Sequence, residues 1–249
     1  LLASKRSAGK EIAFMGKTYT VEEATFDSFK GMDIALFAGG SISKDFAPHA
    51  VKAGAVVIDN SSAFRMDPEV PLVVPEVNPQ AILKHKGIIA NPNCSTIIMV
   101  MALKPIYDLA KIKRVIVSTY QAVSGAGKEG IDELDAQVRE HSEGREMTAN
   151  ILPSASAEKH YPIAFNLIPQ IDVFCDNLYT KEEMKMVNET KKIMEDYEMR
   201  ITATTIRVPV YRSHSESVNI ELEKEVDLGA MREALAKFPG VTVQDDPSK

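Results

Sequence analysis

Residues 33–58 read DIALFAGGSISKDFAPHAVKAGAVVI. The apolar run 33–37 stops at Gly39-Gly40, which is typical of a buried strand followed by a turn. The run 55–58 predicts a second buried strand, and Gly54 stands where the helix between the two runs would end. A strand, a helix and a strand within about thirty residues form a βαβ unit, which predicts a parallel sheet with a right-handed crossover.

The same pattern returns more loosely further along the chain. We expect Ser41 or Ser43 to cap the first helix. The run 88–90 predicts a third strand, and after a tight turn an apolar helix follows from Ser95. Pro105 is expected to kink or end that helix, because proline removes a helical hydrogen bond.

The second half of the chain has a different character. Residues 115–120, 201–210 and 218–222 read as strands, the last two with partial alternation. A charged helix between them begins at the capping box Thr180-Lys-Glu-Glu183, and residues 227–238 predict a further helix. Long strands with separate helices predict an α+β second domain that joins the first near Cys94.

The composition limits the partners. The chain has 249 residues, a net charge of −6 and two cysteines. Without a basic surface field we expect neither a nucleic-acid partner nor a membrane partner, so any anion site must use individually placed Arg or Lys residues. Two cysteines form no disulfide framework, which favours a reducing, cytoplasmic location. No paired-His spacing occurs, so we expect no metal site.

Cys94 is the strongest candidate for catalysis. It follows a strand and the turn Asn91-Pro92-Asn93, and it lies at the start of a helix. The free N–H groups and the positive end of that helix favour a thiolate, and they could hold an oxyanion on an attacked carbonyl. The alternative is a small buried side chain, the role that we assign to Cys175.

A thiol nucleophile needs a base, and His214 is the best placed of five histidines. It lies in the polar turn 211–216 between two strands, where functional side chains are common. The segment Ser124-Gly-Ala-Gly127 precedes a helix, and its small residues let a ligand approach backbone N–H groups. A merely flexible turn is an equally good interpretation of that segment.

At NPNCST (91–96) the sequence resembles aspartate-semialdehyde dehydrogenase, a phosphorylating NADP enzyme of amino-acid biosynthesis. The resemblance runs over essentially the whole chain, and five further blocks agree in order. These blocks are LASKRSAGK (2–10), VVPEVN (73–78), STYQAVSGAG (118–127), IPQID (168–172) and RVPVYRSHSE (207–216).

The resemblance implies an α/β fold with two parts. Residues 1–94 would form a partial NADP-binding Rossmann-type domain with a parallel sheet. Residues 95–249 would form an α+β catalytic and dimerisation domain of the glyceraldehyde-3-phosphate dehydrogenase-like type. The implied reaction interconverts L-aspartate 4-semialdehyde and 4-phospho-L-aspartate through a Cys thioester, with inorganic phosphate as a partner. The family pattern also implies a homodimer and a role in lysine (diaminopimelate), threonine and methionine biosynthesis.

Site residues follow from the matched motifs. Cys94 matches the nucleophile and His214 its acid–base partner. The matched substrate-binding residues have distinct roles: Gln121 positions the substrate, Arg207 pairs with the α-carboxylate, Glu182 attracts the ammonium group, and Arg65 and Lys185 bind phosphate. Asn93 belongs to the same substrate-binding set.

The resemblance implies NADP as the cofactor. An Arg flanked by hydroxyls suits the 2′-phosphate of NADP, whereas an NAD site usually has an acidic residue there. The matched cofactor residues are Ser4, Arg6 and Ser7 at the 2′-phosphate, and Gly39, Gly40, Ser41, Ser124, Gly125, Ala126 and Gly127 along the rest. The family's Gly-rich first turn would precede Leu1 and its C-terminal segment would follow Lys249. We therefore expect a fragment with an incomplete sheet that binds NADP poorly by itself.

Two alternatives stay open. N-acetyl-γ-glutamyl-phosphate reductase shares the Cys–His chemistry, but its substrate amine is acetylated, so Glu182 would have little purpose there. A non-catalytic homologue that serves as an interaction subunit is the other alternative, and the intact set Cys94, Gln121, Arg207 and His214 argues against it.

Overall fold

The computed structural model of the chain describes residues 1–154 and 157–248, and it divides into two compact units. The first unit is Leu1–Asn93, and the second begins at Cys94. None of the helices in the described residues is long and apolar enough to cross a bilayer.

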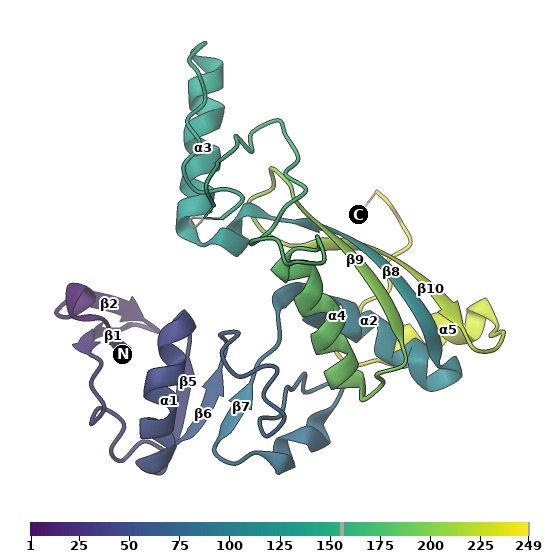
Figure 1. The fold of residues 1–249 in the computed structure, drawn as a ribbon, viewed down its shortest axis with the longest axis horizontal. Coiled ribbons are helices and arrows are strands. Elements are labelled where there is room, and N and C mark those ends of the chain that lie inside the picture. The colour runs from purple at the N-terminus through teal and green to yellow at the C-terminus, as the bar shows by residue number, and fades with distance from the viewer. Residues whose placement is uncertain (155–156, 249) are drawn as a thin grey trace. The chain divides into compact units, whose positions relative to one another are not determined.

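A three-stranded parallel sheet forms the centre of the first unit. Its order is β5 (Ile34–Phe37), β6 (Val56–Asp59) and β7 (Ile88–Ala90), with α1 (Ser43–Lys52) between the first two strands in the sequence. Figure 1 shows α1 lying along this sheet. The predicted βαβ unit and its parallel pairing are therefore confirmed. Gly54, at a φ of 100°, follows the end of α1 in a conformation that glycine adopts without strain.

The expectation that β5 is buried is wrong. Ile34 is 66% exposed and Leu36 is 71% exposed. Successive side chains of a strand point to opposite faces, and only Ala35 and Phe37 pack against the apolar cluster beneath α1. In the described residues β5 pairs with β6 alone, so it is an edge strand of this sheet.

The expected serine cap of α1 is also wrong. A short 3-10 helix, Gly40–Ile42, leads directly into α1, so Ile42 occupies the cap position and no side chain caps the helix. The hydroxyl of Ser43 is buried and makes no hydrogen bond in the described parts of the chain. The 3-10 helix replaces the side-chain cap for the first amide of α1, because the Ser43 amide donates hydrogen bonds to the carbonyls of Gly40 and Ser41.

The N-terminal part of the first unit contains four short strands. β1 (Leu2–Ala3) pairs in parallel with β4 (Glu22–Glu23). Between them, β2 (Glu11–Phe14) and β3 (Lys17–Thr20) form an antiparallel hairpin. The sequence analysis did not predict this hairpin, and all of its strand residues are exposed.

The second unit is built on a mixed three-stranded sheet. Its central strand β8 (Ile112–Gln121) pairs in parallel with β9 (Arg200–Arg207) and antiparallel with β10 (Ser215–Leu222). The helices α2 (Cys94–Ala110) and α4 (Lys181–Met194) lie together against this sheet (Figure 1). The core between them is apolar and includes Met99, Leu103, Val115, Val117 and Met186.

The helix α2 runs through Pro105 to Ala110, so the expectation that it could end at Pro105 is wrong. Proline removes one donor from the helical ladder, but Leu103, Pro105 and Ala110 are all buried on this helix. Burial on both sides of the proline holds the helix together across the lost hydrogen bond.

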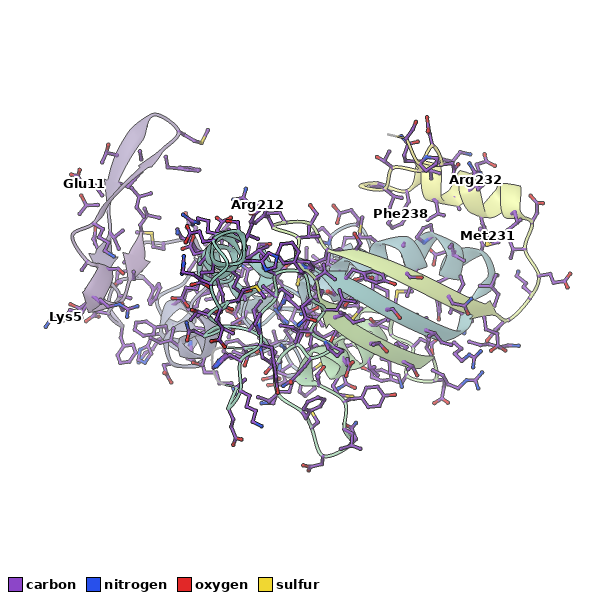
Figure 2. All side chains as sticks on the ribbon, turned by 90° about the horizontal axis from the view of Figure 1, so that it is seen from above. Lys5, Glu11, Arg212, Met231, Arg232 and Phe238 are labelled. Atoms are coloured by element: carbon purple, nitrogen blue, oxygen red, sulfur yellow. The ribbon has the colours of Figure 1, made fainter. Side chains whose placement is uncertain are left out.

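The capping box of α4 is confirmed. The Glu183 amide donates to Thr180 Oγ1 at 3.2 Å, and the Thr180 amide donates to Glu183 Oε2 at 2.7 Å. The predicted helix near the C-terminus is α5 (Leu228–Lys237), with Asp227 as its cap. Figure 2 shows Met231 and Arg232 on α5, and Arg232 forms an ion pair with Asp245.

The helix α3 (Lys128–Ser142) anchors the long segment that follows it. Glu133 Oε2 accepts hydrogen bonds from the amides of Asn150 and Ile151 at 2.6 and 2.8 Å. One turn later, Gln137 Oε1 accepts from the amides of Ile163 and Ala164. Two buried side chains of one helix therefore satisfy the amides of residues 150–151 and 163–164, which lie outside helices and strands.

Candidate active site

Five elements of the second unit position the predicted catalytic residues and three of the predicted substrate-binding residues. Gln121 ends β8 and Arg207 ends β9, and the parallel register pairs these two residues directly. His214 precedes β10, which runs in the opposite direction, so its start lies at the same edge of the sheet. Cys94 opens α2 and Glu182 lies in the first turn of α4.

Cys94 reaches solvent at the start of α2. Its burial on the protein side and the Glu182 carboxylate raise the pKa of the thiol above its usual value. The Ser95 amide and hydroxyl and the Arg207 charge act in the opposite direction but do not outweigh them. The helix start favours the thiolate as expected, but burial and Glu182 outweigh it, so the net direction is the opposite and the thiol must lose its proton during the reaction.

His214 is held by the backbone. Its Nδ1 accepts a hydrogen bond from the Ala122 amide at 3.0 Å, so the neutral ring carries its proton on Nε2. Burial and the positive charge of Arg207 lower the pKa of His214, while Glu182 acts against them. The ring is therefore neutral at physiological pH.

Arg207 is a buried cation with unused donors. It is 3% exposed, and its Nη1 donates to the Ala122 carbonyl at 2.8 Å. Its Nε is buried and donates to no acceptor in the described part of the chain. Burial lowers the pKa of Arg207, and the charges of Glu182 and Cys94 act against this. A guanidinium so arranged suits a carboxylate ligand, which would satisfy the free donors.

Glu182 is the buried anion of the same site, at 5% exposure. Gln121 Nε2 donates to Glu182 Oε1 at 3.2 Å, and Lys185 Nζ donates to Glu182 Oε2 at 3.1 Å. The prediction that Glu182 and Lys185 share one face of a helix is confirmed by this contact.

Two residues of this network were not predicted. Thr119 Oγ1 donates to Gln121 Oε1 at 3.0 Å and so fixes which way the amide points. Asp172 Oδ2 accepts from Lys185 Nζ at 3.0 Å. Thr119 could have been found from the strand period, because residues two apart on a strand share a face. Asp172 ends the block 168–172 that carries the resemblance, but nothing in that block indicates its contact with Lys185.

The predicted small-residue turn borders the catalytic side chains. Val123–Ala126 is a 3-10 helix, and Gly127 follows it at a φ of 82°. A Cβ atom on Gly125 would lie 2.6 Å from Arg207 Nη1 and 3.4 Å from His214 Nε2. Ser124, Ala126 and Gly127 belong to the same turn, whose proposed contact with a cofactor stays a prediction.

The remaining predicted substrate residues lie in the first unit. Arg65 is 8% exposed, with Nε donating to the Asn91 carbonyl and Nη2 to the Asn60 carbonyl, both at 2.9 Å. Asn93 is buried and directly precedes Cys94 in the chain. Their phosphate-binding and substrate-binding roles stay predictions.

The proposed 2′-phosphate residues occupy the turn after β1. Ser4 precedes the 3-10 helix Lys5–Ser7, which contains Arg6 and Ser7. Ser4 and Arg6 are exposed, and Ser7 is half-buried. Lys5, labelled in Figure 2, is exposed in the same turn. Arg6 makes no ion pair within residues 1–154 and 157–248, so a cation and two hydroxyls are available, and this donor set fits a phosphate group.

The other proposed cofactor turn follows β5. Gly39 precedes a 3-10 helix that contains Gly40 and Ser41. Gly40 has a φ of 66°, and a Cβ atom on it would meet no atom within 4 Å. A turn without side-chain bulk at the carboxyl end of a parallel strand fits a nucleotide. No group of three metal-ligating side chains occurs in the described residues.

Comparisons with known proteins agree along the whole chain. The family model described as semialdehyde dehydrogenase, NAD binding domain, matches residues 1–85, and the one described as semialdehyde dehydrogenase, dimerisation domain, matches residues 103–249. Aspartate-semialdehyde dehydrogenase of Aquifex aeolicus is 58% identical over 99% of this chain and 72% of its own length. The Bacillus subtilis enzyme of that name is 55% identical over 100% and 72%.

Solved structures give the same result. The crystal structure of aspartate semialdehyde dehydrogenase II from Vibrio cholerae has a TM-score of 0.88 and 48% identity, and the match covers 96% of this chain and 70% of that one. The same enzyme complexed with ASA has a TM-score of 0.87 at equal identity and coverage. The predicted α/β fold class, with its Rossmann-type and dimerisation parts, is confirmed, and the chain belongs to the aspartate-semialdehyde dehydrogenase family.

Proposed function

We propose that this protein catalyses the reversible, phosphorylating oxidation of L-aspartate 4-semialdehyde to 4-phospho-L-aspartate, with Cys94 as the nucleophile and NADP as the cofactor. One observation carries the proposal. Arg207 is a buried cation with an unused donor, and it lies in the same site as the buried carboxylate of Glu182 and the thiol of Cys94. An α-amino acid presents the complementary pair of charges.

The charges of the site orient the substrate. Arg207 pairs with the α-carboxylate through donors that the protein leaves free. Glu182 attracts the α-ammonium group, and Gln121 fixes the position of Glu182 by its amide hydrogen bond. Two opposite charges at one end of the substrate define the direction in which its side chain extends, and the aldehyde carbon is thereby presented to the thiol.

Cys94 Sγ attacks the aldehyde carbon and forms a hemithioacetal, and the amides at the start of α2 stabilise the oxygen that becomes negative. The chemistry that NADP supplies when bound is hydride acceptance in this direction and hydride donation in the reverse. The carbon is left as a thioester on Cys94. An oxygen of inorganic phosphate then attacks the thioester carbon, the C–S bond breaks and the acyl phosphate leaves.

Proton movement in these steps involves His214. The Ala122 amide occupies Nδ1, so Nε2 is the ring atom that exchanges protons with the reacting groups. The lowered pKa of His214 keeps the ring neutral, ready to hold the proton that Cys94 gives up. The raised pKa of Cys94 makes this exchange necessary, because the resting thiol is protonated.

The remaining assignments rest on the donor chemistry. Arg65 and Lys185 would bind the phosphate, and Asn93 would contact the substrate. Ser4, Arg6 and Ser7 would hold the 2′-phosphate of NADP, since their turn offers a cation and hydroxyls without an acidic side chain. Gly39, Gly40, Ser41 and the turn of Ser124, Gly125, Ala126 and Gly127 would line the rest of the cofactor.

We also propose that the protein acts as a homodimer in the biosynthesis of lysine, threonine and methionine. The match of residues 103–249 to a dimerisation domain supports the homodimer. The names of the curated relatives support the place in amino-acid biosynthesis. The cytoplasmic location stays a prediction from the two cysteines.

The substrate test uses the chain extended at both ends to the length of its relatives, because the sequence as given is expected to bind NADP poorly by itself. It follows NADPH appearance from L-aspartate 4-semialdehyde and NADP, with and without phosphate. We expect phosphate-dependent turnover that is lost in Cys94→Ala. The matched control is Cys175→Ala, which removes the other thiol and should retain turnover. Turnover of N-acetylglutamate semialdehyde in place of the aspartate compound would move the protein to the rival reaction, and inactivity with both would favour the non-catalytic homologue.

A further inference from the structure

Asp172 is a rigidly held carboxylate beside the proposed site. It precedes α4 in the chain and has a φ of 68°, a left-handed conformation that Asp and Asn tolerate better than most residues. Its Oδ1 accepts from the Val173 amide at 2.8 Å, and its carbonyl accepts from Gln170 Nε2 at 3.2 Å. These contacts leave Oδ2 to face Lys185.

Lys185 lies between two carboxylates. Its Nζ is 3.0 Å from Asp172 Oδ2 and 3.1 Å from Glu182 Oε2, and its side chain is 26% exposed. Burial would lower the pKa of Lys185, but the Glu182 and Asp172 carboxylates outweigh it and raise the value. Burial would raise the pKa of Asp172, but the Val173 amide and Lys185 outweigh it and lower the value. Lys185 and Asp172 are therefore both charged near neutral pH.

The proposed anion site contains more negative than positive side chains, which is unusual for a site that binds an anion. One ammonium group faces two carboxylates, so a phosphate that approaches Lys185 Nζ also approaches the negative charge of Asp172. At the same time, Lys185 neutralises part of the negative charge with which Glu182 would attract the substrate ammonium group. The degree to which Asp172 neutralises the charge of Lys185 therefore affects the affinities for both phosphate and the substrate ammonium group.

We propose that Asp172 is a positioning residue that holds Lys185 between itself and Glu182. It thereby weakens the binding of phosphate and strengthens the binding of the amino end of the substrate. This inference rests on the proposed function and adds a residue to it. Asp172 touches neither ligand and acts only through Lys185.

Removal of the Asp172 charge should move the two affinities in opposite directions. Without its second carboxylate, Lys185 attracts phosphate more strongly, so the KM for phosphate falls. Lys185 also neutralises Glu182 more completely, so the substrate ammonium group is held less tightly and the KM for the semialdehyde rises. A structural role for Asp172 would loosen the site and raise both KM values together.

The test is Asp172→Asn, because asparagine keeps an oxygen for the Val173 amide and tolerates the left-handed backbone. We expect the KM for phosphate to fall and the KM for L-aspartate 4-semialdehyde to rise, each by about three- to tenfold, with a smaller change in kcat. Asp172→Ser, a second neutral variant, should give the same two signs. Asp172→Glu, which keeps the charge, should return both values toward those of the unsubstituted protein.

The matched control is Asp176→Asn, an equal charge change in the same segment. Asp176 is exposed and forms no ion pair within the described residues, so both KM values should stay within about twofold. A fall of the two KM values together, a rise of the two together, or no change in Asp172→Asn would overturn the inference.

A binding measurement separates this inference from the proposed function. Calorimetric titration of inorganic phosphate into the purified protein needs no turnover, and the dissociation constant should fall by about three- to tenfold in Asp172→Asn. An unchanged or weaker phosphate affinity contradicts the inference even if the enzyme is active. Inactivity of the unsubstituted protein toward the semialdehyde, with tighter phosphate binding in the variant, contradicts the proposed reaction alone.

Discussion

Gly125 stands directly against Arg207: a Cβ atom at position 125 would lie 2.6 Å from Nη1 of the guanidinium. The same atom would lie 3.3 Å from Cε1 of His214. Both side chains are also bound to the backbone of Ala122, one through its carbonyl and the other through its amide. The turn at the end of β8 therefore sets the positions of the proposed carboxylate ligand and the proposed base.

Gly125→Ala should impair activity more than stability. Gly125 does not have a positive φ, so alanine fits the backbone, but its methyl group must displace Arg207 or the His214 ring. A displacement of about 1 Å in a catalytic group costs up to about a hundredfold in rate, so we expect kcat/KM to fall by about ten- to a hundredfold. Steady-state kinetics and a thermal melt measure the two effects. An unchanged kcat/KM would show that catalysis does not depend on the observed positions of Arg207 and His214.

The pH profile should reflect the lowered pKa of His214. Burial and Arg207 disfavour the charged ring, so the pKa in the free enzyme lies below the usual 6.5. The neutral ring is the form that accepts a proton, so kcat/KM should decline on the acid side with a midpoint below pH 6.5. Rates measured between about pH 5 and 8 test this. An acidic limb centred above pH 6.5 would contradict the assignment.

Glu216 should make the protein less stable as the pH rises. Its carboxylate oxygens are buried without a hydrogen-bond partner in the described residues, and burial raises the pKa of Glu216 to about 8. The unfolded chain ionises near 4.5, so unfolding releases a proton between pH 4.5 and about 8, and higher pH favours unfolding in that window. This contribution is fully present below pH 4.5 and is lost as the pH rises through about 8.

The variant Glu216→Gln cannot ionise and should lack this dependence. The difference between its free energy of unfolding and that of the unsubstituted protein should increase with pH, by up to about 1.4 kcal/mol per pH unit in that window. Denaturant titrations at several pH values measure the difference, and Glu225→Gln, an exposed carboxylate after β10, controls for the loss of one charge. A constant difference between Glu216→Gln and the unsubstituted protein across the window would refute the buried neutral carboxyl.

Thr180→Ala should weaken the start of α4. The hydroxyl of Thr180 caps the Glu183 amide, and loss of such a cap costs about 1 kcal/mol of stability. Glu182 lies in the first turn of the same helix, so the KM for the semialdehyde should rise together with the loss of stability. Thr180→Ser keeps the hydroxyl and should restore both quantities. An equal loss in the Ser variant would mean that packing of the methyl group, rather than the cap, is responsible.

The sequence predicted those helices and strands that are determined by residues close together in the chain. The βαβ unit followed from two apolar runs separated by a glycine-bounded helix, and α4 followed from its capping box. The hairpin of β2 and β3 escaped prediction because its strands have no buried face, so no apolar pattern marks them. The exposure of β5 depends on which elements cover its outer face, which the run 33–37 does not encode.

The candidate site shows the same division. Cys94 was predicted from the turn and helix start around it, and His214 from the polar turn between two strands. Thr119 and Asp172 were missed because their roles depend on contacts set by the strand register and by the segment before α4. The direction of the Cys94 pKa was also beyond local reasoning, because burial and Glu182, 88 positions away in the chain, outweigh the helix start.

The most direct test of the account is the covalent state of Cys94 during the reaction. The protein, extended at both ends to the length of its relatives, is incubated with L-aspartate 4-semialdehyde and NADP in the absence of phosphate, quenched in acid and digested for mass spectrometry. We predict an aspartyl adduct on the peptide of Cys94, none on that of Cys175, and loss of the adduct when phosphate is added before the quench. Phosphate-dependent turnover without an adduct on Cys94, or with one on Cys175 instead, would contradict the account.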